Sequence, residues 1–272
     1  MALDLTAVHV PLRLEPIRAE LAVSRLGNRF HYFEQISSTN NRARELAEGS
    51  APEGEVVVAE AQSAGRGRVG RHWVSPAWAN LYLSTILRPN LQPAEVPQIT
   101  LMAAVALADT LESFVPVPPT IKWPNDILVA GKKLAGILTE VSCDAEGVDY
   151  VILGMGINLN YPEAMMPDEI RHRATSVLQL TGRPVSRESV LKRLIRDLDR
   201  CYGELEDSGF APLAARWQAR FGLRDRRVRV ELLDQRIIGV ARGIDRDGAL
   251  LLEDESGARQ RIVAGDVVPV ET

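Results

Sequence analysis

Hydrophobic positions follow two different periods along the first part of the chain and only one period after residue 225. Spacings of three and four residues are typical of amphipathic helices, whereas apolar runs and strict alternation are typical of strands. Both patterns interchange before Phe221-Gly222, and only short alternating segments follow it. The change predicts an α+β domain over residues 30–223 and a small all-β domain over residues 224–272.

Three segments of the first domain have the pattern of helices. A polar Ser-Ser-Thr-Asn start at residues 37–40 precedes a helix over 43–47, which Gly49 ends. Residues 100–114 form an alanine-rich helix that a proline-rich segment ends. Residues 189–205 form the longest amphipathic helix, with an apolar stripe opposite its charges. Residues 1–29 are an N-terminal extension with one short helical pattern over 17–26, too little for a domain.

Strand patterns fill most of the remaining sequence. In the first domain they cover residues 56–59, 81–87, 121–123, 127–129, 134–141 and 150–159. We expect these strands to form one mixed sheet covered by the helices. In the second domain strands are predicted over 228–232, 237–242, 250–253 and 262–263, with turns at 234–235 and 247–248, as in a small barrel. This barrel could equally be a passive cap.

The segment from Gly65 to Trp73 carries the first chemical signal, because glycines and arginines alternate in it. Glycine lets the backbone approach a ligand closely, and arginine donates bidentate hydrogen bonds to phosphate or carboxylate oxygens. The pattern predicts a loop that is mobile when empty and closes on an anionic ligand. Taken alone, it could also be a solvated surface turn or a loose RNA-binding segment.

Composition narrows the alternatives. A formal net charge of −4 argues against bulk nucleic-acid binding, for which a basic face is typical. Only two cysteines occur, Cys143 and Cys201, so we expect a reducing compartment. No apolar run approaches the roughly 18 residues of a membrane span, and no signal-peptide pattern is present. These observations predict a cytoplasmic protein that binds neither a membrane nor DNA.

Four segments resemble, in order, those of one enzyme family. They are Ser38-Thr39-Asn40, the Gly65–Trp73 loop, Lys122-Trp123-Pro124-Asn125-Asp126 followed by Lys133-Leu134-Ala135-Gly136-Ile137-Leu138, and Gly154-Met155-Gly156-Ile157-Asn158. The combination resembles the biotin protein ligases, also called biotin–[acetyl-CoA-carboxylase] ligases. The resemblance implies a biotin/lipoate ligase-like domain with an SH3-like C-terminal barrel. Bifunctional members carry an N-terminal winged helix-turn-helix of roughly 60 residues, for which residues 1–29 are too few, so the resemblance implies the ligase without the repressor.

The resemblance also implies a reaction and its substrates. Biotin's carboxylate attacks the α-phosphate of ATP, and the resulting biotinyl-5′-AMP acylates a lysine of a biotin carboxyl carrier protein or domain. Because both reactants of the first step are anions, fixed cations must separate them. Arg66, Arg68, Arg71 and Lys133 are the cations that the motifs supply. Mg²⁺ is expected with ATP, and the sequence leaves its ligands unknown.

Roles are carried over from the family to matching residues only. Arg68, Lys133 and Asp126 are expected to be catalytic, Asp126 by orienting and deprotonating the acceptor amine. The expected biotin-binding residues are Ser38, Thr39, Asn40, Gln62, Arg66, Gly67, Arg68, Lys133, Gly154 and Gly156. The expected ATP-binding residues are Arg68, Arg71, Trp73, Asn125, Lys133 and Asn158.

Several of these residues have plainer alternatives. Ser38 and Thr39 could serve only to cap a helix, Trp73 could be an ordinary core residue, and Asn125 and Asp126 could only shape a turn. Glu140 is expected to lie on a solvated face. Biotin's ring is expected to lie on the strand backbone at Gly154 and Gly156.

Two alternative functions stay open. A lipoate or octanoate ligase of related architecture would need a long apolar tunnel, against which the short polar side chains of Ser38, Thr39, Asn40 and Gln62 argue. A non-catalytic, biotin-sensing or DNA-binding regulator would need a basic recognition helix, which the sequence lacks. A homodimer is possible, and the sequence does not identify the acceptor carboxylase.

Overall fold

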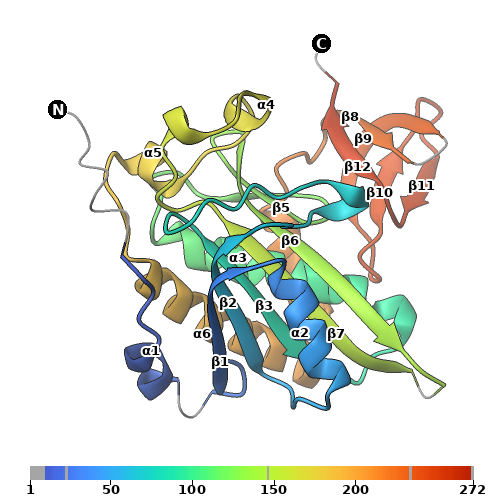
Figure 1. Cartoon of the computed structure of the whole chain (residues 1–272). Coiled ribbons are helices and arrows are strands. Elements are labelled where there is room, and N and C mark those ends of the chain that lie inside the picture. Colours follow the sequence, from blue (N-terminus) through green and yellow to red (C-terminus); the bar gives the residue numbers. More distant parts are fainter. Residues whose placement is uncertain (1–9, 22–23, 146, 233–234, 271–272) are drawn as a thin grey trace.

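The computed structural model describes residues 10–21, 24–145, 147–232 and 235–270, which form two sheets with helices around the first (Figure 1). The first sheet has seven strands in the order β1-β2-β3-β7-β6-β5-β4. Only β1 and β2 run parallel, and the other neighbours are antiparallel, so the sheet is mixed as predicted. Its strands are β1 (Arg29–Ile36), β2 (Glu55–Gln62), β3 (Leu81–Leu87), β4 (Thr120–Lys122), β5 (Asp126–Val129), β6 (Lys132–Cys143) and β7 (Val148–Ile157).

Helices cover the two faces of this sheet unequally (Figure 1). On one face α3 (Pro97–Glu112), α6 (Arg187–Ser208) and α7 (Ala211–Ala219) build the main core together with alternate strand residues such as Val56 and Leu153. On the other face α2 (Thr39–Glu48) packs Ala43 and Ala47 on Val57 and its neighbours. Because α2 is only 10 residues long, part of this second face is left uncovered beyond its N-terminus.

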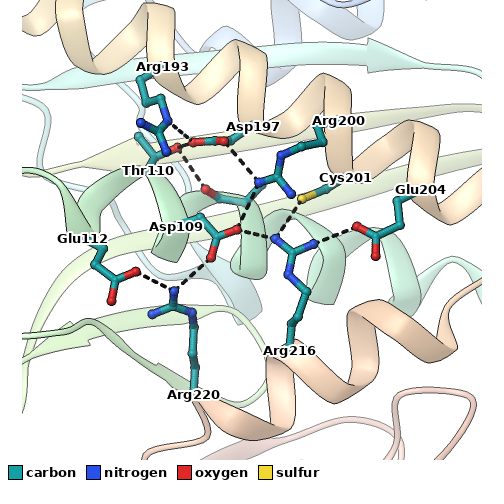
Figure 2. A network of polar contacts seen from close by, with 11 residues as sticks. Asp109, Thr110, Glu112, Arg193, Asp197, Arg200, Cys201, Glu204, Arg216 and Arg220 are labelled. Carbon is teal, nitrogen blue, oxygen red and sulfur yellow. Dashed lines mark hydrogen bonds and ion pairs between the residues drawn. The ribbon is translucent and has the colours of Figure 1, made fainter.

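The three helices of the main layer are tied together by ion pairs (Figure 2). Asp109 of α3 accepts hydrogen bonds from Arg200 at 3.1 Å, from Arg220 at 2.9 Å and from Arg216. The backbone carbonyl of Arg220 then accepts the Ile121 N–H at 2.8 Å, beside β4. The network therefore fixes the point at which the chain leaves the first domain, next to the start of the Lys122–Asp126 motif.

The helix α3 corrects one expectation about composition. Residues Pro93–Glu112, which include the short 3₁₀ helix η3 (Pro93–Glu95), have the length and the mean hydropathy, 1.2, of a candidate membrane span. However, 72% of the apolar window is buried inside the protein. Its apolar character is explained by contacts with α6, α7 and the sheet.

The N-terminal part of the fold differs most from the prediction. The strand β1, at the edge of the sheet, was not predicted, because the adjacent Tyr32 and Phe33, followed by Glu34 and Gln35, interrupt the alternation that is typical of a strand. The predicted helix over 17–26 is shorter, α1 (Glu15–Glu20), and residues 22–23 of that pattern lie outside the described residues. Leu12, Leu14 and Ile17 are buried in the main core, so the described part of the extension packs on the first domain.

Other short elements also escaped the sequence analysis. They are α4 (Asp168–Arg171), α5 (Val177–Thr181), α7 and the last strand, β12 (Asp266–Pro269). The remaining predicted helices and strands are present, with ends that differ by a few residues.

The C-terminal residues form a five-stranded antiparallel sheet in the order β11-β10-β9-β8-β12, consistent with the predicted SH3-like barrel. Its strands are β8 (Arg227–Glu231), β9 (Arg236–Ile244), β10 (Leu250–Glu253), β11 (Arg259–Ile262) and β12. Part of the predicted turn at 234–235 lies outside the described residues. The barrel contacts the first domain directly, since the buried Trp123 Nε1–H donates to the Gly248 carbonyl at 3.1 Å.

Candidate active site

A cavity of about 350 Å³ opens on the uncovered part of the α2 face. It is bounded by β6 and β7, the N-terminus of α2, the Gly65–Trp73 loop and β12 of the barrel. The residues predicted to bind ligands or to catalyse all line it: Ser38, Thr39, Asn40, Gln62, Arg66, Gly67, Arg68, Arg71, Trp73, Asn125, Asp126, Lys133, Gly154, Gly156 and Asn158. The fold thus brings four distant segments to one place.

At one end of the cavity, short polar side chains form a cross-bonded cluster. The Gln62 Oε1 atom accepts from the backbone N–H of Thr39 at 2.9 Å and from its hydroxyl at 3.2 Å. Ser84 of β3 donates to Thr39 Oγ1 at 2.8 Å and to Asn40 Oδ1 at 2.6 Å. Ser38, although it is the N-cap of α2, makes no side-chain capping bond. Capping alone therefore does not explain its buried position.

Two glycines of β7 let other groups lie flat against the sheet. A Cβ atom at Gly156 would come within 2.4 Å of the Trp73 indole, and one at Gly154 within 1.9 Å of Asn40 Oδ1. The backbone at Gly154 and Gly156 is therefore covered by Asn40 and Trp73, where we had expected biotin's ring itself. Glycine is needed at both positions because any side chain would displace these two groups.

Trp73 separates the polar end of the cavity from its charged end. Its ring lies over the strands, and Lys133 Nζ is 5.2 Å from the ring centroid, within cation–π distance. The indole Nε1–H has no hydrogen-bond partner among the described residues.

Three cationic side chains converge at the charged end. Lys133 Nζ lies 2.6 Å from Asp126 Oδ1. Arg68 Nη1 donates to Asn125 Oδ1 and to the Gly265 carbonyl, both at 3.3 Å, and burial lowers its pKa below the usual value. Arg71 pairs with Asp266 of the barrel. Each cation is held by a protein oxygen in a position that an anionic ligand oxygen could contact.

The third arginine of the loop, Arg66, is held by Glu140. Glu140 Oε2 accepts from Arg66 Nη2 and from Asn40 Nδ2, both at 2.7 Å, and Oε1 accepts from Arg44 at 2.6 Å. The expectation that Glu140 lies on a solvated face was therefore wrong. Its carboxylate instead links β6 to the loop and to the polar cluster, because β6 passes beneath both.

The turn that contains Asn125 and Asp126 is tied to β6. Asn125 Nδ2 donates to the Ile137 carbonyl at 2.7 Å, and the Ile137 N–H donates to the Asn125 carbonyl at 3.0 Å. Asn125 thus has the structural role that the sequence left open, while its Oδ1 still contacts Arg68. Asp126 begins β5 opposite Gly136, which places its carboxylate beside Lys133.

Four further residues of the site were not identified from the sequence. Ser84 lies in an otherwise apolar buried strand, which indicates packing, and Glu140 was expected to be solvated. Lys122 lines the cavity, and burial lowers the pKa of its ammonium group. It belongs to the quoted motif, so a closer reading could have found it. Asp266 lies in a strand that was not predicted, and no local signal marks it.

The carboxylates of the cavity do not form a dedicated metal cage. Within the described ranges, no group of three or more His, Cys, Asp or Glu residues could hold a metal ion. Asp126 and Asp266 line the cavity, but both are paired with cations. This donor set fits Mg²⁺ that arrives with nucleotide phosphates, because Mg²⁺ is commonly bound by one or two carboxylates together with phosphate oxygens.

Comparison with known proteins agrees with the fold. Residues 32–158 match the Biotin/lipoate A/B protein ligase family, and residues 225–268 match the Biotin protein ligase C terminal domain. The biotin–[acetyl-CoA-carboxylase] ligase of Mycobacterium tuberculosis is 36% identical over 97% of this chain and 98% of its own length. The bifunctional ligase/repressor BirA of Bacillus spizizenii is 39% identical over 92% of this chain and 77% of its own length.

A solved structure gives the same result. The biotin protein ligase of Aquifex aeolicus in complex with biotin and ATP superimposes with a TM-score of 0.77, at 28% identity, over 90% of this chain and 99% of that one. The description of the first family model names both biotin and lipoate ligases, and that of the C-terminal domain names biotin protein ligase. The chain belongs to the biotin protein ligase family.

Proposed function

We propose that the cavity binds biotin and ATP side by side, joins them as biotinyl-5′-AMP, and transfers biotin to a lysine of a biotin carboxyl carrier domain. The observation that carries this proposal is the arrangement of Lys133, Arg68 and Arg71 beside the polar Thr39–Gln62 cluster, with Trp73 between them. A polar pocket next to fixed cations suits a molecule with a polar ring and a carboxylate that must meet a phosphate.

In the first step an oxygen of biotin's carboxylate attacks the α-phosphorus, and the bond to the pyrophosphate oxygen breaks. Two anions approach each other in this step, and their repulsion is offset by cations already fixed in place. Lys133 and Arg68 are the groups that we assign to this task. Their present partners, Asp126 and the Gly265 carbonyl, hold them ready before the substrates bind.

The second step needs a group that accepts a proton from the acceptor lysine as its nitrogen attacks the anhydride and AMP leaves. We assign this role to Asp126, because its carboxylate lies in the cavity beside Lys133. When the adenylate occupies Lys133, the Asp126 oxygen becomes available to orient the incoming amine. The roles of Arg66, Gly67 and Arg71 as contacts to biotin or nucleotide are part of the same proposal.

Mg²⁺ would neutralise charge on the nucleotide phosphates when it binds with them. Asp126 and Asp266 are the cavity carboxylates that could contribute an oxygen to it. No step of the proposal depends on a metal held by the protein alone.

A lipoate or octanoate ligase is disfavoured by the chemistry of the pocket. Ser38, Thr39, Asn40 and Gln62 are buried or half-buried at its inner end. Thr39 is bonded to Gln62, and Ser84 contacts both Thr39 and Asn40. A straight apolar chain would offer these polar groups no further hydrogen bond and would remove them from water, which is unfavourable for each polar atom that it leaves without a partner. We therefore assign biotin as the acid.

We propose further that the protein acts in the cytoplasm and has no DNA-binding role. Its exposed Cys143 and buried Cys201 are both free thiols, as in a reducing compartment. The net charge of −4 disfavours nucleic acid. Whether two copies associate is not part of the proposal.

The experiment mixes the purified protein with ATP, Mg²⁺, an isolated biotin carboxyl carrier domain and one acid at a time. We expect the carrier to gain the mass of one biotinyl group with biotin, and no modification with lipoate or octanoate. A carrier with its acceptor lysine changed to arginine is the matched control and should stay unmodified. Modification by octanoate at a comparable rate would contradict the assignment of biotin.

A further inference from the structure

A fully buried asparagine lies behind the nucleotide end of the cavity and does not line it. Asn80 precedes β3 and has no exposed surface. Its Oδ1 atom accepts from the Leu159 N–H at 2.9 Å, and its Nδ2 atom donates to Asn158 Oδ1 at 3.4 Å. Asn158, in contrast, lines the cavity. The two amides therefore connect the backbone after β7 to the site.

The backbone determines how both amides are oriented. A peptide N–H can only donate, so the Asn80 atom that faces Leu159 must be its oxygen. The NH₂ group of Asn80 consequently faces Asn158, and only the oxygen of Asn158 can accept it. The NH₂ group of Asn158 is thereby turned away from Asn80. No hydrogen bond within the described part of the chain uses that NH₂ group.

Asn80 is itself held rigidly. Its carbonyl accepts from Arg187 Nη1 at 3.2 Å, and Arg187 is fixed by a buried ion pair with Glu60. Asn158 is fixed by its backbone, whose N–H donates to the Leu134 carbonyl at 2.9 Å, next to Lys133. The backbone of Asn158 is thus fixed, and the orientation of its side-chain amide depends on its contact with Asn80.

From this geometry we propose that Asn80 is a positioning residue for nucleotide binding. By accepting from Leu159 and donating to Asn158, it makes Asn158 present a hydrogen-bond donor, and not an acceptor, to a nitrogen or oxygen acceptor of the bound nucleotide. This inference rests on the proposed function, in which Asn158 contacts ATP. It adds a residue, remote from the ligand, that determines which kind of atom Asn158 can recognise.

The test uses Asn80→Asp, which keeps the size of the side chain and its acceptor for Leu159. An aspartate has no NH₂ group, so its second oxygen faces Asn158 and attracts the NH₂ group of that residue. Asn158 then presents its oxygen to the nucleotide. In calorimetry with biotin-saturated protein, we expect the Kd of ATP, measured with its α,β-methylene analogue that cannot release pyrophosphate, to rise by about tenfold or more, as for loss of one hydrogen bond to a ligand together with an unfavourable contact. The Kd of biotin should stay within about twofold, because the polar cluster is untouched.

Asn160→Asp is the matched control. Asn160 is also buried and bridges backbone, since its Oδ1 and Nδ2 both bond Val185 at 2.9 Å, but it does not line the cavity. It should lower the unfolding temperature without a comparable change in the Kd of ATP. If Asn80→Asp fails to fold, Asn80→Ser, whose hydroxyl can both donate and accept, should give a smaller rise in the same Kd.

A double-mutant cycle decides whether Asn80 acts through Asn158. In an Asn158→Ala background, Asn80→Asp should cause no further loss of ATP affinity. The proposal that Asn80 orients Asn158 would be overturned if Asn80→Asp lowered ATP affinity equally in the Asn158→Ala background, or if it left the Kd of ATP unchanged on its own. Either result would leave the ligase function intact. Absence of ATP binding by the unaltered protein would instead contradict the proposed function as well.

Discussion

Lys133 and Asp126 are joined at 2.6 Å in the cavity, although they are expected to act in different steps of the reaction. Lys133 would stabilise charge while the adenylate forms, and Asp126 would receive the acceptor's proton afterwards. The two roles can be separated experimentally, because the first step is measured by pyrophosphate release and the second by transfer from pre-formed adenylate.

For the first step, we expect Lys133→Ala and Arg68→Ala each to slow adenylate formation by about 10² or more. That figure corresponds to the loss of a stabilising contact of about 3 kcal/mol. Lys132→Ala is the control, because Lys132 is adjacent in β6 but does not line the cavity. Pyrophosphate release at the unaltered rate in both cavity variants would show that neither residue stabilises charge during adenylate formation.

For the second step, we expect Asp126→Asn to slow single-turnover transfer of biotin from pre-formed biotinyl-5′-AMP to a carrier domain. The substitution keeps the size of the side chain and removes the charge that would orient and deprotonate the lysine. If instead transfer is unchanged and the rate of adenylate formation falls, our assignment is wrong. Asp126 would then contact the nucleotide and its metal, or would hold Lys133 in place.

Sequence motifs identified the residues of the cavity but not all of their partners. All of the residues predicted to bind ligands line the cavity. The motifs predicted this because their side chains can act on one ligand only if they lie close together. Their contacts with ligands remain predictions. Glu140 and Ser84 were missed because a polar residue in a strand has no local pattern that distinguishes a solvated position from a bonded one.

At the scale of elements, the Gly65–Trp73 loop is expected to be the most mobile part of the site. In the structure the two sides of the loop run antiparallel, with Arg66 opposite His72. Between them lies one 3₁₀ turn, η2 (Arg68–Gly70). Few apolar contacts hold it, and Val69 at its tip is exposed. Segments of this kind open at low free-energy cost.

Limited proteolysis tests this expectation. A protease specific for arginine should cut the loop in the empty protein and cut it more slowly when biotin and ATP are present, because ligand oxygens would hold its arginines. Cleavage at Arg246, which is exposed in the barrel, is the internal reference. Equal rates at the loop with and without ligands would mean that it is already rigid.

Elements with a strong pattern were predicted and weak ones were not. The helix α6 was found because its apolar stripe is long. The helix α7 has only nine residues, and the alternation in β1 is broken by the adjacent Tyr32 and Phe33, so local periodicity gave neither. Their positions depend on contacts distant in sequence, such as Arg216 with Asp109 (Figure 2).

At the scale of the whole molecule, the division into an α+β part and a C-terminal barrel follows from the change of periodicity, but the contact between them does not. Arg71 and Asp266 are 195 positions apart and meet in the cavity. Pro269 of the barrel also lines it, and the Gly265 carbonyl accepts a hydrogen bond from Arg68 of the cavity. The barrel therefore contributes to the site and is more than a passive cap.

The net charge of the whole molecule leads to a prediction about DNA. With −4 at neutral pH, the protein is expected to show no sequence-specific binding to a biotin operator, with or without biotin. A gel-shift or anisotropy titration checks this, with a bifunctional ligase/repressor as the positive control. A complex that survives moderate salt and excess competitor DNA would contradict the prediction.

The most direct test of the account is pyrophosphate release by the purified protein in the absence of any acceptor. With ATP, Mg²⁺ and biotin, we predict a stoichiometric burst of pyrophosphate and a bound product with the mass of biotinyl-5′-AMP. Octanoate or lipoate in place of biotin should give no burst. Release that is independent of biotin, or equal with octanoate, would contradict the claim that this cavity activates biotin.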